Sequence, residues 1–326
     1  GTARAVVEDL LDMIDQTGAR DYSPDGINRN LTGAAYIFYY ETLMTEQERT
    51  ELADRIAKER KAAHRYLDEM PSNEYPRVAS FAIRELIIAQ SDAKQFDAHT
   101  VLGSILLGHK PTEVHSTMVA HLTKALIRRL IDTDPAAVVG LKGCKNVAEV
   151  AARKAELLDT AYECGLYHDV GKSAIIQNID NNGRRLIDEE FQGIETHPAI
   201  GCGLLQEAGC GKYMAPAALY HHRFYNGQGG YPKDVPPCPP EVKVIVDALS
   251  VADSLDAATD NIGRCYQMAK PFRTLVGELQ AQSGTRYAPK VVALFDDKDF
   301  CAELAQRLDE KRKEVYLQAY HIGKEK

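Results

Sequence analysis

Histidines and aspartates recur in the second half of the sequence in a pattern that could hold divalent metal ions. His168 and Asp169 are adjacent in YHDVGK, and His221 and His222 are adjacent in YHHRFYNGQGGYP. His197 lies between these two motifs, and Asp253 and His115 complete the candidate set. Neighbouring residues of a helix point about 100° apart, so His168 and Asp169 can serve one centre only at a helix end, or if the carboxylate bridges two ions.

A buried carboxylate strengthens this interpretation. Asp253 lies in the apolar stretch ALSVADSLDAATD, and a buried carboxylate is costly unless it is paired or bound to metal. Imidazole and carboxylate side chains from separate helices form the interior ligand sets of metal-binding helical bundles. The alternative is a group of core histidines that are each satisfied independently.

The elements expected to position these residues are helices, because helical periodicity dominates and no segment alternates like a strand. The sequence therefore predicts an all-α protein. The predicted helices are 2–17, 33–43, 46–70, 76–92, 112–132, 147–168, 188–196, 198–208, 214–222, 240–262, 266–283 and 288–318. Thr45 and Glu48 have the spacing of a capping box that opens the third helix. The segment 18–33 is rich in Gly, Pro, Asn and Asp and is predicted to be a loop.

Composition excludes several classes of protein. The chain has 326 residues and a formal net charge of −8, which argues against a surface that binds polymeric nucleic acid. No apolar run is long enough to span a membrane, and the seven cysteines form no CxxC pair, so a cytoplasmic protein is expected. The sequence begins with Gly1 and shows no signal peptide, which is compatible with a sensor or membrane region upstream.

The order of the motifs resembles the HD-GYP family, metal-dependent phosphodiesterases of the HD superfamily. YHDVGK, a His-Pro followed by glycine at 197–201, a His-His pair before GGYP, and VADSLDAATD before an Arg-x-Tyr occur in the family's order. The resemblance runs from about His115 to the segment 284–295. It implies an HD-superfamily helical bundle over residues 101–326, with an additional helical region over 1–100 that could be sensory, serve dimerisation or extend the core.

The same resemblance implies a binuclear metal centre. One ion would be held by His115, His168, Asp169 and Asp253, and the other by Asp169, His197, His221 and His222. His115 is favoured over His121 because HSTMV resembles the family's opening helix. Iron or manganese suits such a site. Some members use a third ion, but Pro111 occupies the position of its glutamate, so two metals are expected. The reaction implied is hydrolysis of a cyclic dinucleotide, most typically cyclic diguanylate, by a hydroxide that bridges the ions.

Substrate-binding residues are also implied by the resemblance. Lys172 is expected to meet a phosphate oxygen or the leaving alkoxide and is counted with Asp169 as catalytic. The other candidates are Arg264 and Tyr266 of the Arg-x-Tyr motif, Lys270, Tyr231 and Arg223. Arg223 replaces the family's usual glutamate, and the glycine loop is one residue longer than usual. Both departures concern substrate recognition. Two alternatives therefore stay open: an HD-type phosphohydrolase for another nucleotide or phosphoester, and a non-catalytic cyclic-dinucleotide receptor. Whether the chain forms a homodimer also stays open.

Overall fold

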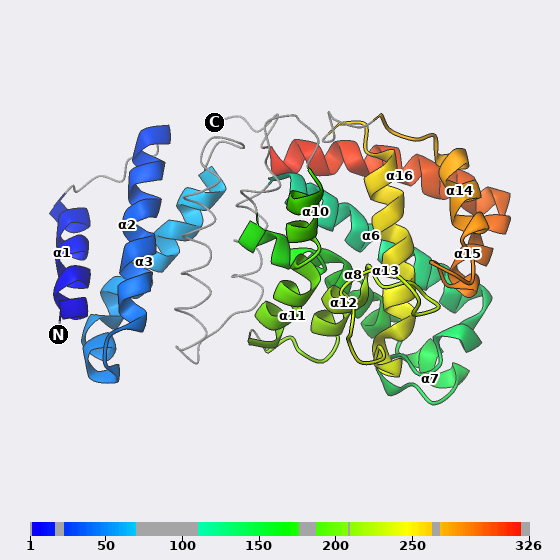
Figure 1. Cartoon of the computed structure of the whole chain (residues 1–326), viewed down its shortest axis with the longest axis horizontal. Coiled ribbons are helices and arrows are strands. Elements are labelled where there is room, and N and C mark those ends of the chain that lie inside the picture. Colours follow the sequence, from blue (N-terminus) through cyan, green and yellow to red (C-terminus); the bar gives the residue numbers. More distant parts are fainter. Residues whose placement is uncertain are drawn as a thin grey trace. The chain divides into compact units, whose positions relative to one another are not determined.

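The chain is built from helices wherever its structure is described. The computed structural model describes residues 2–16, 23–69, 110–175, 187–207, 209–262 and 268–320. Within these ranges every regular element is a helix, and the only β pairing is two isolated bridges, Arg223 with Gly230 and Ser283 with Tyr287 (Figure 1). The prediction of an all-α fold is confirmed. In the same ranges, no helix combines the length and apolar character needed to cross a lipid bilayer.

The chain divides into two compact units. One comprises Gly1–Lys110 with Ser173–Asp180, and the other comprises Pro111–Lys172 with Asn181–Lys326. The sequence analysis placed a boundary at residue 100, whereas this division falls at Lys110 and assigns a short later segment to the first unit. The roles expected for the N-terminal region stay predictions.

The first unit contains α1 (Thr2–Gln16), α2 (Pro24–Thr42) and α3 (Glu46–Glu69), which pack against one another. Helix α2 corrects the sequence analysis, which predicted a loop over 18–33. The Ser23 side chain caps the helix by accepting from the Gly26 amide, and Pro24 occupies the first helical position, where proline is favoured. The Pro and Gly that suggested a loop therefore belong to the start of a helix.

The capping box predicted at the start of α3 is confirmed. The Thr45 amide donates to Glu48 Oε2 at 2.8 Å, and the Glu48 amide donates to Thr45 Oγ1 at 3.3 Å. Two amides that would otherwise lack helical partners are satisfied in this way. The helix predicted over 76–92 lies outside the described residues.

The second unit holds the helices that carry the candidate metal ligands (Figure 1). Within the described residues, the α-helices of this unit are α6 (Lys110–Thr133), α7 (Val147–Ala152), α8 (Lys154–Tyr167), α10 (Asp188–Ile194), α11 (His197–Glu207), α12 (Met214–Tyr220), α13 (Pro240–Thr259), α14 (Phe272–Ala281), α15 (Pro289–Val292) and α16 (Lys298–Ala319). Two predicted helices are interrupted. The helix over 147–168 breaks at Arg153, and the one over 288–318 breaks where the Asp297 carboxylate caps the start of α16 by accepting from the Asp299 and Phe300 amides.

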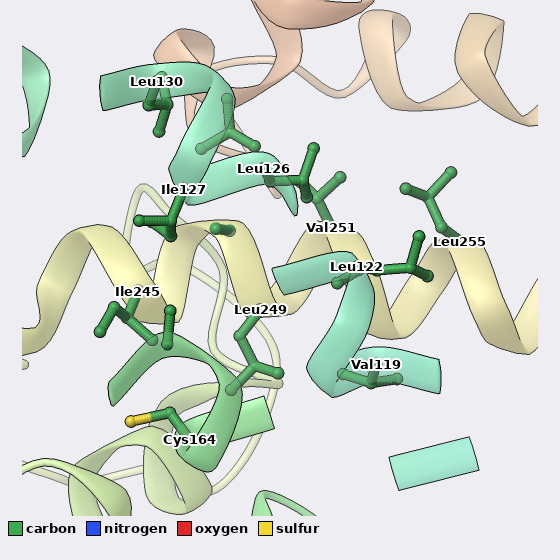
Figure 2. Packing of buried hydrophobic residues seen from close by; sticks show 14 of the residues in the cluster. Val119, Leu122, Leu126, Ile127, Leu130, Cys164, Ile245, Leu249, Val251 and Leu255 are labelled. Carbon is green, nitrogen blue, oxygen red and sulfur yellow. The ribbon is translucent and has the colours of Figure 1, made fainter. Parts of the chain in front are cut away.

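The core of this unit is formed chiefly by α6 and α13, with α8 beside them. Figure 2 shows α6, with Leu122 and Leu126, crossing α13, whose Leu249 and Leu255 belong to the same buried cluster. All four side chains are buried. Each fully buried aliphatic side chain of this size contributes about 1.5–3 kcal/mol, so these helices form a rigid frame for the ligands attached to them.

Candidate metal centre

Three of the candidate histidines lie at the end or the start of a helix. His168 follows α8, His197 follows α10 by three residues and opens α11, and His221 follows α12. In each ring Nδ1 lies 2.6–2.7 Å from the carbonyl oxygen three residues earlier in the chain. A carbonyl can only accept, so Nδ1 carries the proton and Nε2 keeps its lone pair. Because Nδ1 is protonated, each ring offers Nε2 to a metal ion. All three side chains are buried.

The fourth histidine is held differently. His115 lies within α6, and its Nδ1 is 2.6 Å from Asp256 Oδ2 of α13. Its Nε2 faces Asp253 Oδ1 at 3.1 Å. Asp253 and Asp256 are one helical turn apart and therefore share a face of α13. Two carboxylates of one helix thus fix both ends of the same imidazole.

Asp169 lies between two sets of histidines and offers one oxygen to each. Its Oδ2 is 3.4 Å from Nε2 of His115 and 3.4 Å from Nε2 of His168. Its Oδ1 is 3.1 Å from His197 Nε2 and 3.8 Å from His221 Nε2. A carboxylate oriented in this way can bridge two ions.

The ligand atoms form two groups of suitable size for metal ions. One group is His115, His168 and Asp253, and the other is Asp169, His197, His221 and His222, with all atoms of a group within 4.8 Å of one another. Ligands at about 2.1 Å from an ion lie roughly 3.0–3.5 Å apart in octahedral or tetrahedral geometry. His197 Nε2 and His221 Nε2 are 3.2 Å apart, which matches that spacing.

Two buried atoms at the centre also require a ligand. His168 Nε2 and Asp169 Oδ1 are buried without a hydrogen-bond partner among the described residues. Unpaired buried polar atoms are costly and uncommon in native proteins. Both atoms are potential metal ligand atoms of the two groups, so the residues present fit the metal centre that the motifs predict.

Burial keeps most of these ligands in the protonation state that metals bind. It lowers the pKa of His168, of His221 and, to about 3, of His222, so these imidazoles are neutral at physiological pH. Burial alone would raise the pKa of Asp169, but Lys172 and His168 outweigh it and hold this pKa well below the usual value. Neutral imidazoles and an ionised carboxylate need no proton removal before they bind a cation.

His115 is the exception, and its raised pKa predicts that metal binding depends on pH. Burial lowers its pKa, but the hydrogen bonds to Asp253 and Asp256 outweigh burial and raise it to about 9. The metal must therefore displace a proton from this ring below pH 9. We expect release of one proton at this site and an apparent affinity that falls about tenfold for each pH unit between 8 and 6.5. Calorimetric titration of Mn²⁺ in buffers of different ionisation enthalpy measures both quantities, and binding without proton release at pH 7 would contradict the expectation.

Close backbone packing holds the ligand segments together. A Cβ at Gly171 would lie 2.0 Å from the His197 carbonyl oxygen, and a Cβ at Gly230 would lie 1.9 Å from the His222 carbonyl oxygen. Gly230 also has a φ of 74°, in the left-handed region that favours glycine. The glycine loop can therefore fold directly against the His221-His222 pair.

Of the four described residues predicted to bind substrate, two lie at the metal centre and two have other partners. The Lys172 ammonium donates to Asp169 Oδ2, and the Tyr231 ring centre is 4.5 Å from that of His222, so both lie at the metal centre. Arg223 Nη2 donates to the Gly227 carbonyl at 2.8 Å and thereby braces the glycine loop. Lys270 binds both carboxylate oxygens of Glu278.

Arg264 and Tyr266 lie outside the described residues. His121 packs edge-on against Tyr162 at 5.2 Å between ring centres and is absent from both ligand groups.

Asp256 was not predicted from the sequence, although its position three residues after Asp253 was a signal that it shares the same buried face. Nor was Arg312 predicted, which contacts Asp256 from α16 and for which sequence spacing gives no signal.

Comparison with known families agrees with this geometry. Residues 141–258 match the model of the HD domain family. Over this range the chain is similar to HD domains. The matched range contains all the predicted ligands except His115, which α6 supplies from outside it. The resemblance inferred from the motifs is confirmed.

Curated relatives are similar over the same part of the chain. A cyclic di-GMP phosphodiesterase of Thermotoga maritima is 32% identical over 130 residues, which is 39% of this chain and 34% of the relative. A cyclic di-GMP phosphodiesterase of Pseudomonas aeruginosa is 29% identical over 153 residues, 46% of this chain and 31% of the relative. One of Vibrio cholerae is 29% identical over 145 residues, 42% of this chain and 28% of the relative. The chain thus spans about a third of the length of the relatives it matches.

Proposed function

We propose that this protein is a metal-dependent phosphodiesterase that hydrolyses a cyclic dinucleotide, with cyclic di-GMP as the favoured substrate. The observation that supports this most directly is Asp169, whose two oxygens face separate histidine groups. The names of the curated relatives supply the substrate class. Two divalent ions, iron or manganese by ligand type, are the proposed cofactors.

The residues would divide the work as follows. His115, His168 and Asp253 would hold one ion, His197, His221 and His222 would hold the other, and Asp169 would belong to both. When bound, such ions activate water for attack and neutralise charge on the phosphoryl oxygens. The identity of the nucleophile expected from the sequence stays a prediction.

Lys172 is the proposed cation for the substrate. Its ammonium already donates to Asp169 at the centre, and its side chain is 19% exposed. From there it can hold a proton toward a phosphate oxygen or the departing alkoxide, and water is largely excluded from this contact. Tyr231, whose ring lies beside that of His222, is proposed to form part of the substrate wall.

The glycine loop favours a second candidate, an HD-type phosphohydrolase for a different phosphoester. Arg223, which replaces the family's usual glutamate, is committed to the loop carbonyls of Gly227 and Gly230. The conformation of the glycine loop therefore depends on an arginine that the family usually lacks at this position. A difference here would change which base or phosphoester is accepted while leaving the metal ligands intact.

Chelation and substrate comparison test the proposal together. The full chain, stripped with EDTA and reconstituted with Mn²⁺ or, without oxygen, Fe²⁺, is incubated with cyclic di-GMP, cyclic GMP-AMP and cyclic di-AMP. We expect chromatography to show hydrolysis of cyclic di-GMP that chelation abolishes and metal restores. Three intact dinucleotides with a fully metallated chain would refute the proposal. Cleavage of other nucleotides or phosphoesters by that same sample would favour the second candidate.

A further inference from the structure

A buried charged network connects the candidate metal centre to the C-terminal helix α16. Asp256 Oδ2 lies 2.6 Å from His115 Nδ1, and Asp256 Oδ1 accepts from Arg312 Nη2 at 2.9 Å. Asp256 and Arg312 are each 2% exposed. The carboxylate therefore has one oxygen for the histidine and the other for the arginine.

Arg312 is itself fixed by the end of α13. Its Nη1 donates to the Thr259 carbonyl at 2.9 Å, and its Nη2 donates to Thr259 Oγ1 at 2.9 Å. A guanidinium has only donors in a planar fork, so it demands acceptors in fixed directions. This fixes which oxygen of Asp256 faces α16 and which faces His115.

His115 needs such an external acceptor because of its place in the fold. His168, His197 and His221 use carbonyls near helix ends, where backbone oxygens lack helical partners. His115 lies inside α6, where carbonyls one turn away are engaged by the helix itself. The carboxylate of Asp256 takes the place of the missing carbonyl.

We infer that Asp256, held by Arg312, is the positioning residue that fixes the tautomer and orientation of His115 for metal binding. This inference rests on the metal centre of the proposed function. A purely structural ion pair between α13 and α16 is the alternative. Buried ion pairs are often replaceable by apolar side chains without loss of stability, so fold stability alone is a weak reason for this pair.

The variant Asp256→Asn separates the two explanations. Arg312 can only donate, so it should take the amide oxygen and turn the amide NH₂ toward His115 Nδ1. Nδ1 must then accept, which places the ring proton on Nε2 and blocks the ligand atom. The wild type is expected to bind two Co²⁺ ions. In the variant we expect the affinity of one site to fall about 10–100-fold, with the other site largely unchanged.

Two further variants control for loss of stability. Tyr316→Phe removes the hydrogen bond that Tyr316 of α16 donates to Oδ2 of Asp260, the residue that caps α13, at 2.9 Å, and it leaves Asp256 untouched. It should leave both Co²⁺ affinities unchanged. In Asp256→Asn/Arg312→Met the amide is free to turn its oxygen back to His115. We expect this double variant to recover at least about tenfold of the affinity lost in Asp256→Asn.

Cobalt titrations followed by visible absorption and calorimetry, with thermal unfolding midpoints for each variant, decide the matter. Unchanged Co²⁺ binding in Asp256→Asn, or an equal loss in Tyr316→Phe at a matched midpoint, would overturn the inference. If Asp256→Asn is too unstable to titrate, Arg312→Lys takes its place. It should weaken the same site about tenfold, because an ammonium cannot hold Asp256 and Thr259 together, and no weakening would count against the inference. A wild type that binds no Co²⁺ would instead overturn the metal centre itself.

Discussion

Asp169→Asn is expected to lower kcat/KM for the proposed substrate at least about 10³-fold and to reduce the metal content below two equivalents. The carboxylate faces His115 and His168 with one oxygen and His197 and His221 with the other. An amide has nearly the same shape, but only one of its two ends can ligate a cation, and it carries no charge. Metal analysis and rate measurements on the same preparation check both parts.

A control for this variant is available on the helix that precedes the ligand pair. Asp159 of α8 has a side chain 70% exposed and pairs with Lys124 at 2.9 Å. Asp159→Asn should leave metal content and activity within about twofold, because exposed ion pairs contribute little. An Asp169→Asn protein with two metals and normal turnover would show that the bridge is not needed.

Gly171→Ala is expected to destabilise the second unit by about 3 kcal/mol and to weaken metal binding through His197. The new Cβ would lie 2.0 Å from the His197 carbonyl oxygen and 2.5 Å from the Gly201 amide nitrogen. Both are backbone atoms, so no side-chain rotation can relieve the overlap and the first turn of α11 must move. His197 belongs to that turn, so the loss of stability and the loss of metal affinity should occur together.

Gly203 provides the matched control on the same helix. A Cβ at Gly203 meets no atom within 4 Å, so Gly203→Ala should be neutral or stabilise α11 by up to about 1 kcal/mol. Urea unfolding followed by circular dichroism, combined with Mn²⁺ titration, measures both variants. Equal midpoints for the two would contradict the packing argument.

Helical periodicity identified most described helices correctly, because an amphipathic helix repeats its apolar residues whatever its partners are. The errors lie where a local cap competes with that pattern. Ser23 begins α2 inside a predicted loop, and Asp297 starts a new helix inside a predicted one. A cap depends on the geometry of two or three residues, which periodicity averages over.

The candidate site was likewise predicted only in part from the sequence. The sequence and its resemblance indicated the candidate ligands that the structure brings together, because His and Asp at motif spacing are the residue types that bind divalent metals. The bracing of Arg223 within its loop and the network of Asp256 with Arg312 were not predicted. Both depend on where a long side chain is directed after folding, and spacing along the chain does not record that.

The sequence by itself determined an all-α chain, the residue types of a candidate metal centre and an HD-type resemblance, since these depend on composition, periodicity and motif order. Only the tertiary structure decided that Asp169 turns one oxygen to each histidine group. It also decided that His115 contacts the carboxylate of Asp256, which Arg312 of α16 contacts in turn. The physical reason is that a ligand atom works only when its lone pair is directed and its other atoms are satisfied. Residues 56 positions apart, such as Asp256 and Arg312, meet only once α13 and α16 have packed.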